Sequence, residues 1–194
     1  MGAVGIACRT VVLVEGASDR LALAAVAARL GADLPAAGVD VRSMDGITNL
    51  RQHLAVLQAG AAGELPVLGL YDANEVGYVA HTVGVGASGA FAELEALGFY
   101  ACVRDLEDEV IRAAGPDLVE QALHAAGDLS RFRVFQGQPA QRARPIEAQL
   151  HRFAGTASGR KARFAVDIID LLPDDRMPRP LVALVETAMR TSAR

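Results

Sequence analysis

Two carboxylates follow the first apolar run of the sequence. Val11–Val14 lead directly into Glu15 and Gly16, and Asp19 comes four residues after Glu15. The run predicts a buried strand that ends at Glu15, and ligands bind at the carboxyl ends of strands in open α/β sheets. We expect Ser18 to cap the following helix, with Asp19 in its first turn. Two carboxylates at one strand-to-helix turn can hold a hard cation through oxygen.

Acidic and amide side chains also follow two later apolar runs. Asp72, Asn74 and Glu75 come after residues 67–71, and an acidic segment, 105–109, comes after the run that begins at Phe99. In a parallel sheet these ends share one edge, where crowded carboxylates raise one another's pKa unless a cation neutralises them. Oxygen ligands favour Mg²⁺, Mn²⁺ or Ca²⁺ over zinc.

Helix capping is the competing interpretation of these acids, because carboxylates stabilise the first turn of a helix. We favour capping for Asp19, Asp105 and Asp108. For Glu15 and Asp72 we favour the metal, since each directly follows an apolar strand.

The elements that position these acids alternate between strand and helix, which predicts an α/β fold with a mostly parallel four-stranded sheet flanked by helices. After Gly115 the pattern predicts helices alone. We therefore expect an α/β core over residues 1–115 and a helical extension packed on it over residues 116–194. The expected strands are 11–14, 39–43, 67–71 and 99–103, and the expected later helices are 116–126, 145–153, 158–172 and 180–190.

Composition narrows the classes of function. The 194 residues are 52% apolar with a net charge of −4, so nucleic-acid contact requires a local basic patch. The sequence has no signal peptide, no stretch long enough to span a membrane and no phosphate-binding loop of an ATPase, which predicts a cytoplasmic protein without membrane contact. The four histidines lack metal-ligand spacing, so we expect them to be surface or satisfied polar residues.

Basic residues gather in the second half of the chain. Between Leu129 and Phe164 there are eight of them against one acid, Glu147. This segregation suits contact with a phosphate backbone, and a solvated helical face is an equally weighted alternative. Lys161, the single lysine of the chain, can point back toward the acidic edge and stabilise charge on a phosphoryl group. The candidate nucleic-acid-binding residues are Arg131, Arg133, Arg142, Arg144, Arg160 and Arg163.

Taken in order, these segments resemble a known family. Residues 13–19 (LVEGASD) resemble the first Toprim motif in the form found in OLD (overcoming lysogenization defect) nucleases. Residues 45–50 (DGITNL) are similar to the family's loop from glycine to asparagine, here Gly46 and Asn49. Residues 71–74 (YDAN) stand in the place of its D-x-D motif, and residues 105–109 resemble its later acidic motif. Residues 159–161 (GRK) resemble its late lysine segment.

The resemblance implies a Toprim, Rossmann-like fold and two-metal phosphodiester chemistry with Mg²⁺ or Mn²⁺. It implies Asp19, Asp72 and Glu107 as metal ligands, Glu15 as ligand or general base, and Lys161 as electrostatic stabiliser. Gly16, Gly46 and Asn49 would support the loops.

The chain departs from the family pattern in two ways. Asn74 replaces the second carboxylate of D-x-D, and Glu75 is the adjacent substitute. OLD nucleases carry an ATPase domain before Toprim, which this sequence lacks, so we expect either a stand-alone relative or one that uses an ATPase in trans.

Three functions follow. The first is an OLD-like nuclease that cuts DNA. The second is a degenerate Toprim module that binds nucleic acid or a partner ATPase without cutting. The third is another metal-dependent phosphotransfer or hydrolysis reaction.

Overall fold

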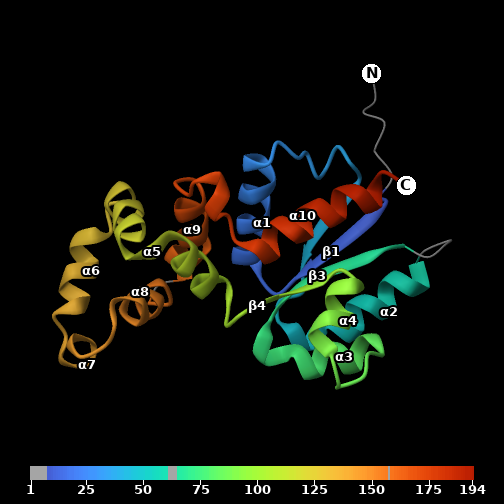
Figure 1. Ribbon diagram of the computed structural model, residues 1–194, viewed down its shortest axis with the longest axis horizontal. Coiled ribbons are helices and arrows are strands. Elements are labelled where there is room, and N and C mark those ends of the chain that lie inside the picture. The colour runs from blue at the N-terminus through green and yellow to red at the C-terminus, as the bar shows by residue number, and fades with distance from the viewer. Residues whose placement is uncertain (1–7, 61–64, 157) are drawn as a thin grey trace.

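A parallel sheet of four strands forms the centre of the molecule (Figure 1). The computed structural model describes residues 8–60, 65–156 and 158–194, and gives only the backbone for 158–162. The strand order is β2-β1-β3-β4, and each neighbouring pair is parallel. The predicted fold class is therefore confirmed. The strands are β1 (Thr10–Val14), β2 (Val39–Ser43), β3 (Val67–Asp72) and β4 (Phe99–Cys102).

Helices cover both faces of this sheet, which explains why β1 is apolar at successive positions. Val12 and Val14 face the side covered by α1 (Ala17–Arg29) and α10 (Arg179–Ser192). Val11 and Leu13 face the opposite side, where a second apolar core forms. The helices on that side are α2 (Leu50–Gly60), α3 (Val76–Val83) and α4 (Ala90–Ala96) (Figure 1).

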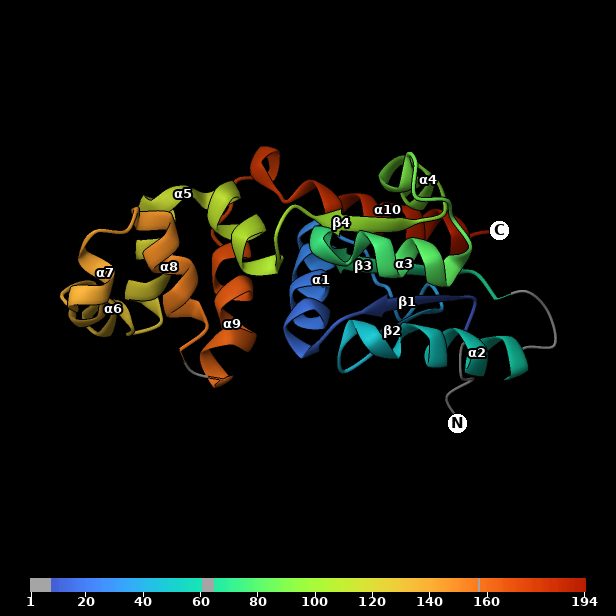
Figure 2. The same cartoon turned by 90° about the horizontal axis from the view of Figure 1, so that it is seen from below.

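A group of helices extends beyond the carboxyl ends of the strands (Figure 2). α5 (Leu106–Ala125) starts after β4 and bends at Gly115, whose φ of 71° and ψ of 161° break the helix before Pro116. α9 (Ser158–Ile169) contacts both α1 and α5, and so joins this group to the sheet. We call residues 116–154 the arm. Beyond the bend of α5 it contains α6 (Leu129–Gln136), α7 (Pro139–Arg142) and α8 (Ile146–Ala154).

The chain returns to the sheet at α10. Ser192 Oγ donates to Thr10 Oγ1 at 2.7 Å, and both side chains are buried. The hydroxyls of Tyr100 and Thr187 lie 2.8 Å apart, so α10 is hydrogen-bonded to β1 and to β4.

Two local expectations differ from the structure. The helix after Glu15 begins at Ala17 with Gly16 as its N-cap, so the expectation that Ser18 caps it is wrong. The Gly16 amide instead donates to Asp19 Oδ2 at 2.9 Å, because Asp19 sits one turn in and can fold back on that orphan donor. The sequence pattern also missed α6 and α7. One-turn 3₁₀ helices occur at Ile47–Asn49, Ala73–Glu75 and Asp174–Arg176.

Candidate functional site

The acids expected at the carboxyl edge of the sheet do converge. Glu15 directly follows β1, Asp72 ends β3, and Glu107 is the second residue of α5, after β4. Asp72 pairs in register with Cys102 of β4, which places it beside the start of the β4–α5 connection. Parallel pairing thus brings three distant segments of sequence to one edge.

The pKa of Asp72 shows the effect of the negative charge at this edge. Its pKa is raised from 3.8 to about 7, first by burial and then by the charges of Glu15, Asp105, Asp19 and Glu107, in that order. A half-buried carboxylate with four others around it is poorly stabilised as an anion. We call Glu15, Asp19, Asp72, Asp105 and Glu107 the carboxylate cluster.

Of the three acids for which capping was favoured, Asp19 and Asp105 accept capping hydrogen bonds, and Asp108 lies in the first turn of α5, where it pairs with Arg112. Asp19 Oδ2 accepts the Gly16 amide, and Asp105 is the N-cap of α5, where its Oδ1 accepts the Asp108 amide at 2.8 Å. The charges of both carboxylates nevertheless raise the pKa of Asp72. Capping and membership of the cluster are therefore compatible, because the cap uses one oxygen and the negative charge remains.

The backbone of Glu15 is held by the loop after β2. Its carbonyl accepts the Gly46 amide at 3.0 Å, in a turn where Asp45 and Gly46 have φ of 56° and 116°. Asn49 donates its side-chain amide to the carbonyls of Met44 (2.9 Å) and Asp45 (3.3 Å). Gly46 suits this positive φ, which side chains disfavour, and Asn49 fixes the loop against the end of β1.

Within segment 105–109, Glu109 makes structural contacts, whereas Glu107 belongs to the carboxylate cluster. Glu109 Oε1 accepts the Val103 amide at 2.6 Å, and its other oxygen pairs with Arg112 at 2.6 Å. Glu109 therefore fastens β4 to α5. Glu107 is buried, and its charge raises the pKa of Asp72. Besides the capping residue Asp105, Glu107 is therefore the acid of this segment that belongs to the cluster.

Asn74 and Glu75 lie at the margin of the cluster. Both belong to the 3₁₀ turn that follows Asp72; Asn74 is exposed, and Glu75 is the N-cap residue of α3. The charges that raise the pKa of Asp72 come instead from the β1–α1 and β4–α5 turns.

His151 lies beside the cluster, which sequence reasoning did not foresee. Its Nε2 is 2.7 Å from Asp105 Oδ2, across 46 residues of sequence. The expectation of a satisfied polar residue is met, but the partner is a cluster carboxylate. Histidine spacing held no signal of this contact, because it depends on how α8 packs.

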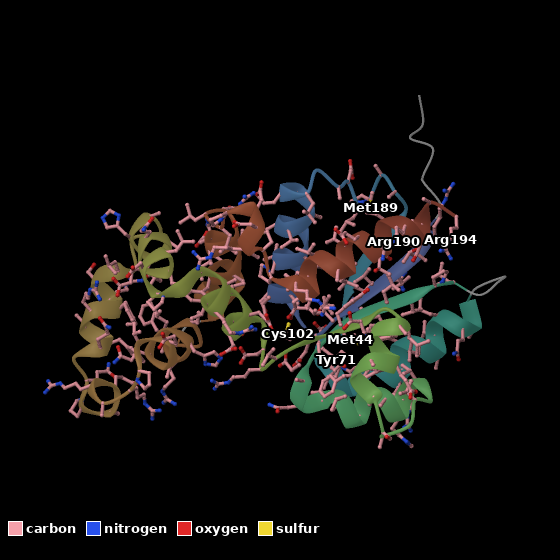
Figure 3. The ribbon with its side chains drawn as sticks, viewed as in Figure 1. Met44, Tyr71, Cys102, Met189, Arg190 and Arg194 are labelled. Carbon is pink, nitrogen blue, oxygen red and sulfur yellow. The ribbon has the colours of Figure 1, made fainter. Side chains whose placement is uncertain are left out.

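Cys102 is a buried neighbour of the cluster at the end of β4 (Figure 3). Burial raises the pKa of its thiol well above the ordinary value, and Glu109, Asp72, Asp19 and Asp105 add to the effect. The side chain therefore stays a neutral thiol at pH 7, and only a thiolate is a strong metal ligand. The donors at this edge are oxygens.

The donor set suits a hard divalent cation. A cation would relieve the repulsion that raises the pKa of Asp72, and carboxylate oxygens are preferred ligands of Mg²⁺ and Mn²⁺. In the part of the chain that the structure describes, no three acids, histidines or cysteines already lie close enough together to hold an ion. The side chains of Lys161 and Arg160 lie outside the described residues.

The candidate nucleic-acid-binding arginines fall into two groups. Arg131, Arg133 and Arg163 have acidic partners: Asp128 at 3.2 Å, Glu120 at 2.7 Å and Asp167 at 3.9 Å respectively. Arg142 and Arg144 are exposed, and their Nε atoms donate to the backbone carbonyls of Gly137 and Ala140.

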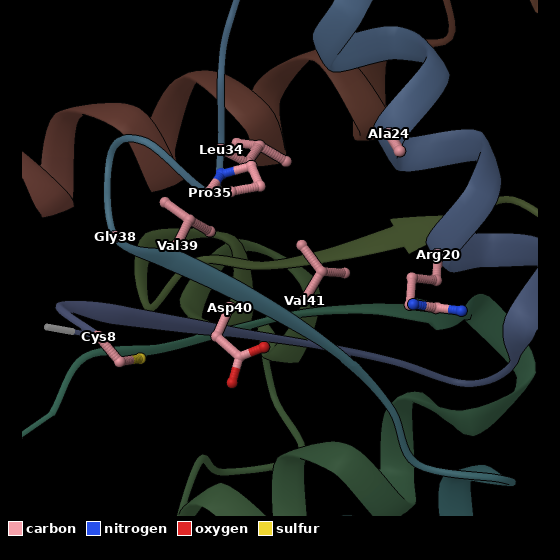
Figure 4. A pocket seen from close by; sticks show the side chains of 9 residues that line it. All are labelled: Cys8, Arg20, Ala24, Leu34, Pro35, Gly38, Val39, Asp40 and Val41. Atoms are coloured by element: carbon pink, nitrogen blue, oxygen red, sulfur yellow. The ribbon is translucent and has the colours of Figure 1, made fainter. Parts of the chain in front are cut away.

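A separate pocket of about 500 Å³ lies between edge strand β2 and α1 (Figure 4). It is lined mainly by small and apolar side chains, with Arg20 and Asp40 as its charged members. The cluster carboxylates are not among its lining residues. Among the described residues, no helix is long and apolar enough to cross a membrane.

The segment that carries the first half of the cluster matches a known family. Residues 8–73, which include Glu15, Asp19 and Asp72, match the family described as "Overcoming lysogenization defect protein-like, TOPRIM domain". The fold is an OLD-like Toprim fold. The resemblance expected from the sequence is thus confirmed, and Toprim domains generally use divalent metal ions.

Solved structures extend this likeness over nearly the whole chain. The C-terminal region of the Burkholderia pseudomallei OLD protein is 18% identical with a TM-score of 0.67, covering 96% of this chain and 100% of that one. The C-terminal region of the Xanthomonas campestris pv. campestris OLD protein is 23% identical with a TM-score of 0.65, covering 95% and 96%. A search of curated proteins found no match.

Proposed function

We propose that this protein is a Mg²⁺- or Mn²⁺-dependent nuclease of the OLD-like Toprim type that hydrolyses DNA phosphodiester bonds. The carboxylate cluster carries the proposal: five carboxylates lie near one another at the carboxyl edge of an OLD-like Toprim sheet, where burial and then the charges of the other four raise the pKa of Asp72 to about 7. The OLD-like Toprim family itself suggests a metal-dependent, nuclease-type function.

Within this proposal, Glu15, Asp19, Asp72 and Glu107 hold the metal, and Asn74 and Glu75 are supplementary oxygen ligands next to Asp72. Bound there, the metal would act as a Lewis acid on the phosphate and lower the pKa of a water molecule. Glu15 is also the proposed general base, and its backbone is held at the end of β1 by the Gly46 amide.

The positive charge needed for the substrate is assigned to the second half of the chain. Lys161 is the proposed electrostatic stabiliser of the developing phosphoryl charge. The arginines at 131, 133, 142, 144, 160 and 163 are the proposed contacts to the DNA backbone.

Plasmid cleavage tests this function. We expect the wild type to cut supercoiled plasmid in Mg²⁺ or Mn²⁺, and Glu15→Ala and Lys161→Ala to lose cutting while their circular dichroism stays unchanged. Glu186→Ala is the matched control, because Glu186 is an exposed acid on α10, ion-paired with Arg190 and remote in sequence from the cluster. Wild-type rates in Glu15→Ala would refute the proposal.

Asn74 favours a second candidate, a Toprim module that binds DNA or a partner ATPase without cutting. An amide at the second D-x-D position brings no charge to a Mg²⁺ site. DNA binding by folded wild type without turnover in either metal would support this candidate. Turnover of nucleotides in the absence of DNA would instead favour another phosphotransfer or hydrolysis reaction.

A further inference from the structure

One side chain of the arm reaches the carboxylate cluster. His151, in the last turn of α8, places Nε2 2.7 Å from Asp105 Oδ2, and both side chains are mostly shielded from solvent. An ionised carboxylate only accepts hydrogen bonds, so the imidazole N–H is the donor. Arg104 Nε lies 4.0 Å from the same oxygen, on a more exposed side chain.

Asp105 is fixed from two directions. Its Oδ1 accepts the Asp108 amide and caps α5, while its Oδ2 meets His151. Asp105 also lies close enough to the cluster for its charge to act on Asp72. The bond between His151 and Asp105 therefore links the first turn of α5, which carries Glu107, to α8.

The arm holds His151 in place independently of this bond. Leu150 and Phe153, on either side of it in α8, are buried, and the Phe153 ring packs on Phe132 at 5.2 Å between centroids. Gln149 donates to the carbonyls of Gln141 and Arg144 at 3.0 and 2.9 Å. These contacts hold the imidazole in position without the bond to Asp105, so it is suited to orienting the Asp105 carboxylate.

We propose that His151 is a positioning residue that holds Asp105, and through it the first turn of α5 with Glu107, in the geometry that binds the metal. This proposal rests on the metal-binding part of the proposed function and does not require DNA cleavage. The arm thereby contributes to the metal-binding edge as well as to DNA contact, and the His151–Asp105 bond connects the two. Partners that orient a ligand-bearing segment commonly change metal affinity 10–100-fold when removed.

The test compares His151→Phe, which removes the donor, with His151→Gln, which keeps one. His124→Phe is the matched control, since His124 is an exposed histidine near the end of α5. The first readout is the affinity for Mn²⁺ alone, measured by calorimetry. We expect about tenfold weaker binding in His151→Phe, recovery to within about threefold in His151→Gln, and no change in the control.

Hydrogen exchange and kinetics supply the other readouts. Amides of residues 106–109 should exchange faster in His151→Phe, and kcat for DNA should fall while KM stays constant. Unchanged Mn²⁺ affinity and unchanged exchange in a folded His151→Phe would overturn the proposal. If the wild type does not cut DNA, the proposed function fails, while these two readouts still decide the role of His151.

A reciprocal variant covers the case in which His151→Phe does not fold. Asp105→Ser keeps an effective N-cap but removes the oxygen that His151 binds. Faster exchange in residues 106–109 of Asp105→Ser supports the proposal, and wild-type exchange there overturns it.

Discussion

Asp72 stands among four other carboxylates, and this makes the stability of the metal-free protein depend on pH. Its pKa is about 7 in the folded chain against 3.8 ordinarily, so the folded state binds a proton that the unfolded state has released between these values. Its contribution to stability is therefore fully present below about pH 4 and is lost as the pH rises through 7. The free energy of unfolding should fall over this range.

Asp72→Asn should remove most of that fall, because the amide cannot ionise. At pH 8 in EDTA we expect the variant to be more stable than the wild type by about 1–2 kcal/mol, after allowance for solvent screening of a half-buried group. At pH 4 the two should be equal. Urea unfolding at both pH values measures the difference, with Asp40→Asn, a surface acid paired with Arg42, as control. Parallel pH profiles for Asp72→Asn and wild type would contradict the prediction.

The sequence allowed the main cluster acids to be predicted where the signal was local. Glu15 and Asp72 each follow an apolar strand directly, and their convergence follows from parallel pairing alone. Asp105 was interpreted as a cap, which is correct, but its part in the cluster depends on distances between turns. The contact with His151 was not predictable, since it depends on the tertiary placement of α8.

At the scale of elements, Arg29 joins α1 to α9 at the point where α9 ends. Its guanidinium donates to the carbonyls of Ile169, Asp170 and Leu172, and pairs with Asp174 at 2.6 Å. The last carbonyls of a helix have no partner within the helix. One side chain of α1 thus satisfies the last carbonyl of α9 and two carbonyls of the turn that follows it.

Arg29→Ala should lower the free energy of unfolding by about 2–3 kcal/mol, because it removes charge-assisted hydrogen bonds and leaves part-buried carbonyls without their donor. Arg29→Lys should recover only part of this, since an ammonium lacks the planar fork. Denaturant midpoints measure both. Arg20→Ala, an exposed arginine on the same helix, should stay within about 0.5 kcal/mol of wild type. An equal midpoint for Arg29→Ala and wild type would show that the contact contributes nothing.

The elements differ in how far the sequence determines them. β1, β3 and β4 were predictable because their apolar runs end at or next to a charged residue, and the long helices because their apolar positions repeat. α6 and α7 were missed because they are short, with eight and four residues, and about half of these residues are polar or basic. α6 buries Phe132 against Phe153, so tertiary packing holds this segment as a helix where local pattern is weak.

At the scale of the whole molecule, the arm extends past the edge that carries the carboxylate cluster (Figure 2). The bend of α5 at Gly115 sets its direction, and Arg176 donates to the Ala114 carbonyl at 2.9 Å, where the first part of α5 ends. Five of the eight basic residues between Leu129 and Phe164 therefore lie on the arm beside an acidic edge, and the other three belong to α9. Under the proposed function, this arrangement would separate DNA contact from metal binding within an acidic protein.

The two groups of arm arginines should contribute unequally to DNA affinity. Arg133 is held by Glu120, so part of its charge is already neutralised, whereas Arg142 and Arg144 are exposed and bond to backbone carbonyls. Each phosphate contact contributes about 0.9 to the slope of log affinity against log salt. Removing Arg142 and Arg144 together should therefore lower that slope by nearly 2, and Arg133→Ala should lower it by clearly less than 1. Fluorescence anisotropy of a labelled duplex in EDTA, titrated at several salt concentrations, measures both without cleavage. If the double variant keeps the wild-type slope, these arginines form a solvated face and the DNA follows another path to the carboxylate cluster.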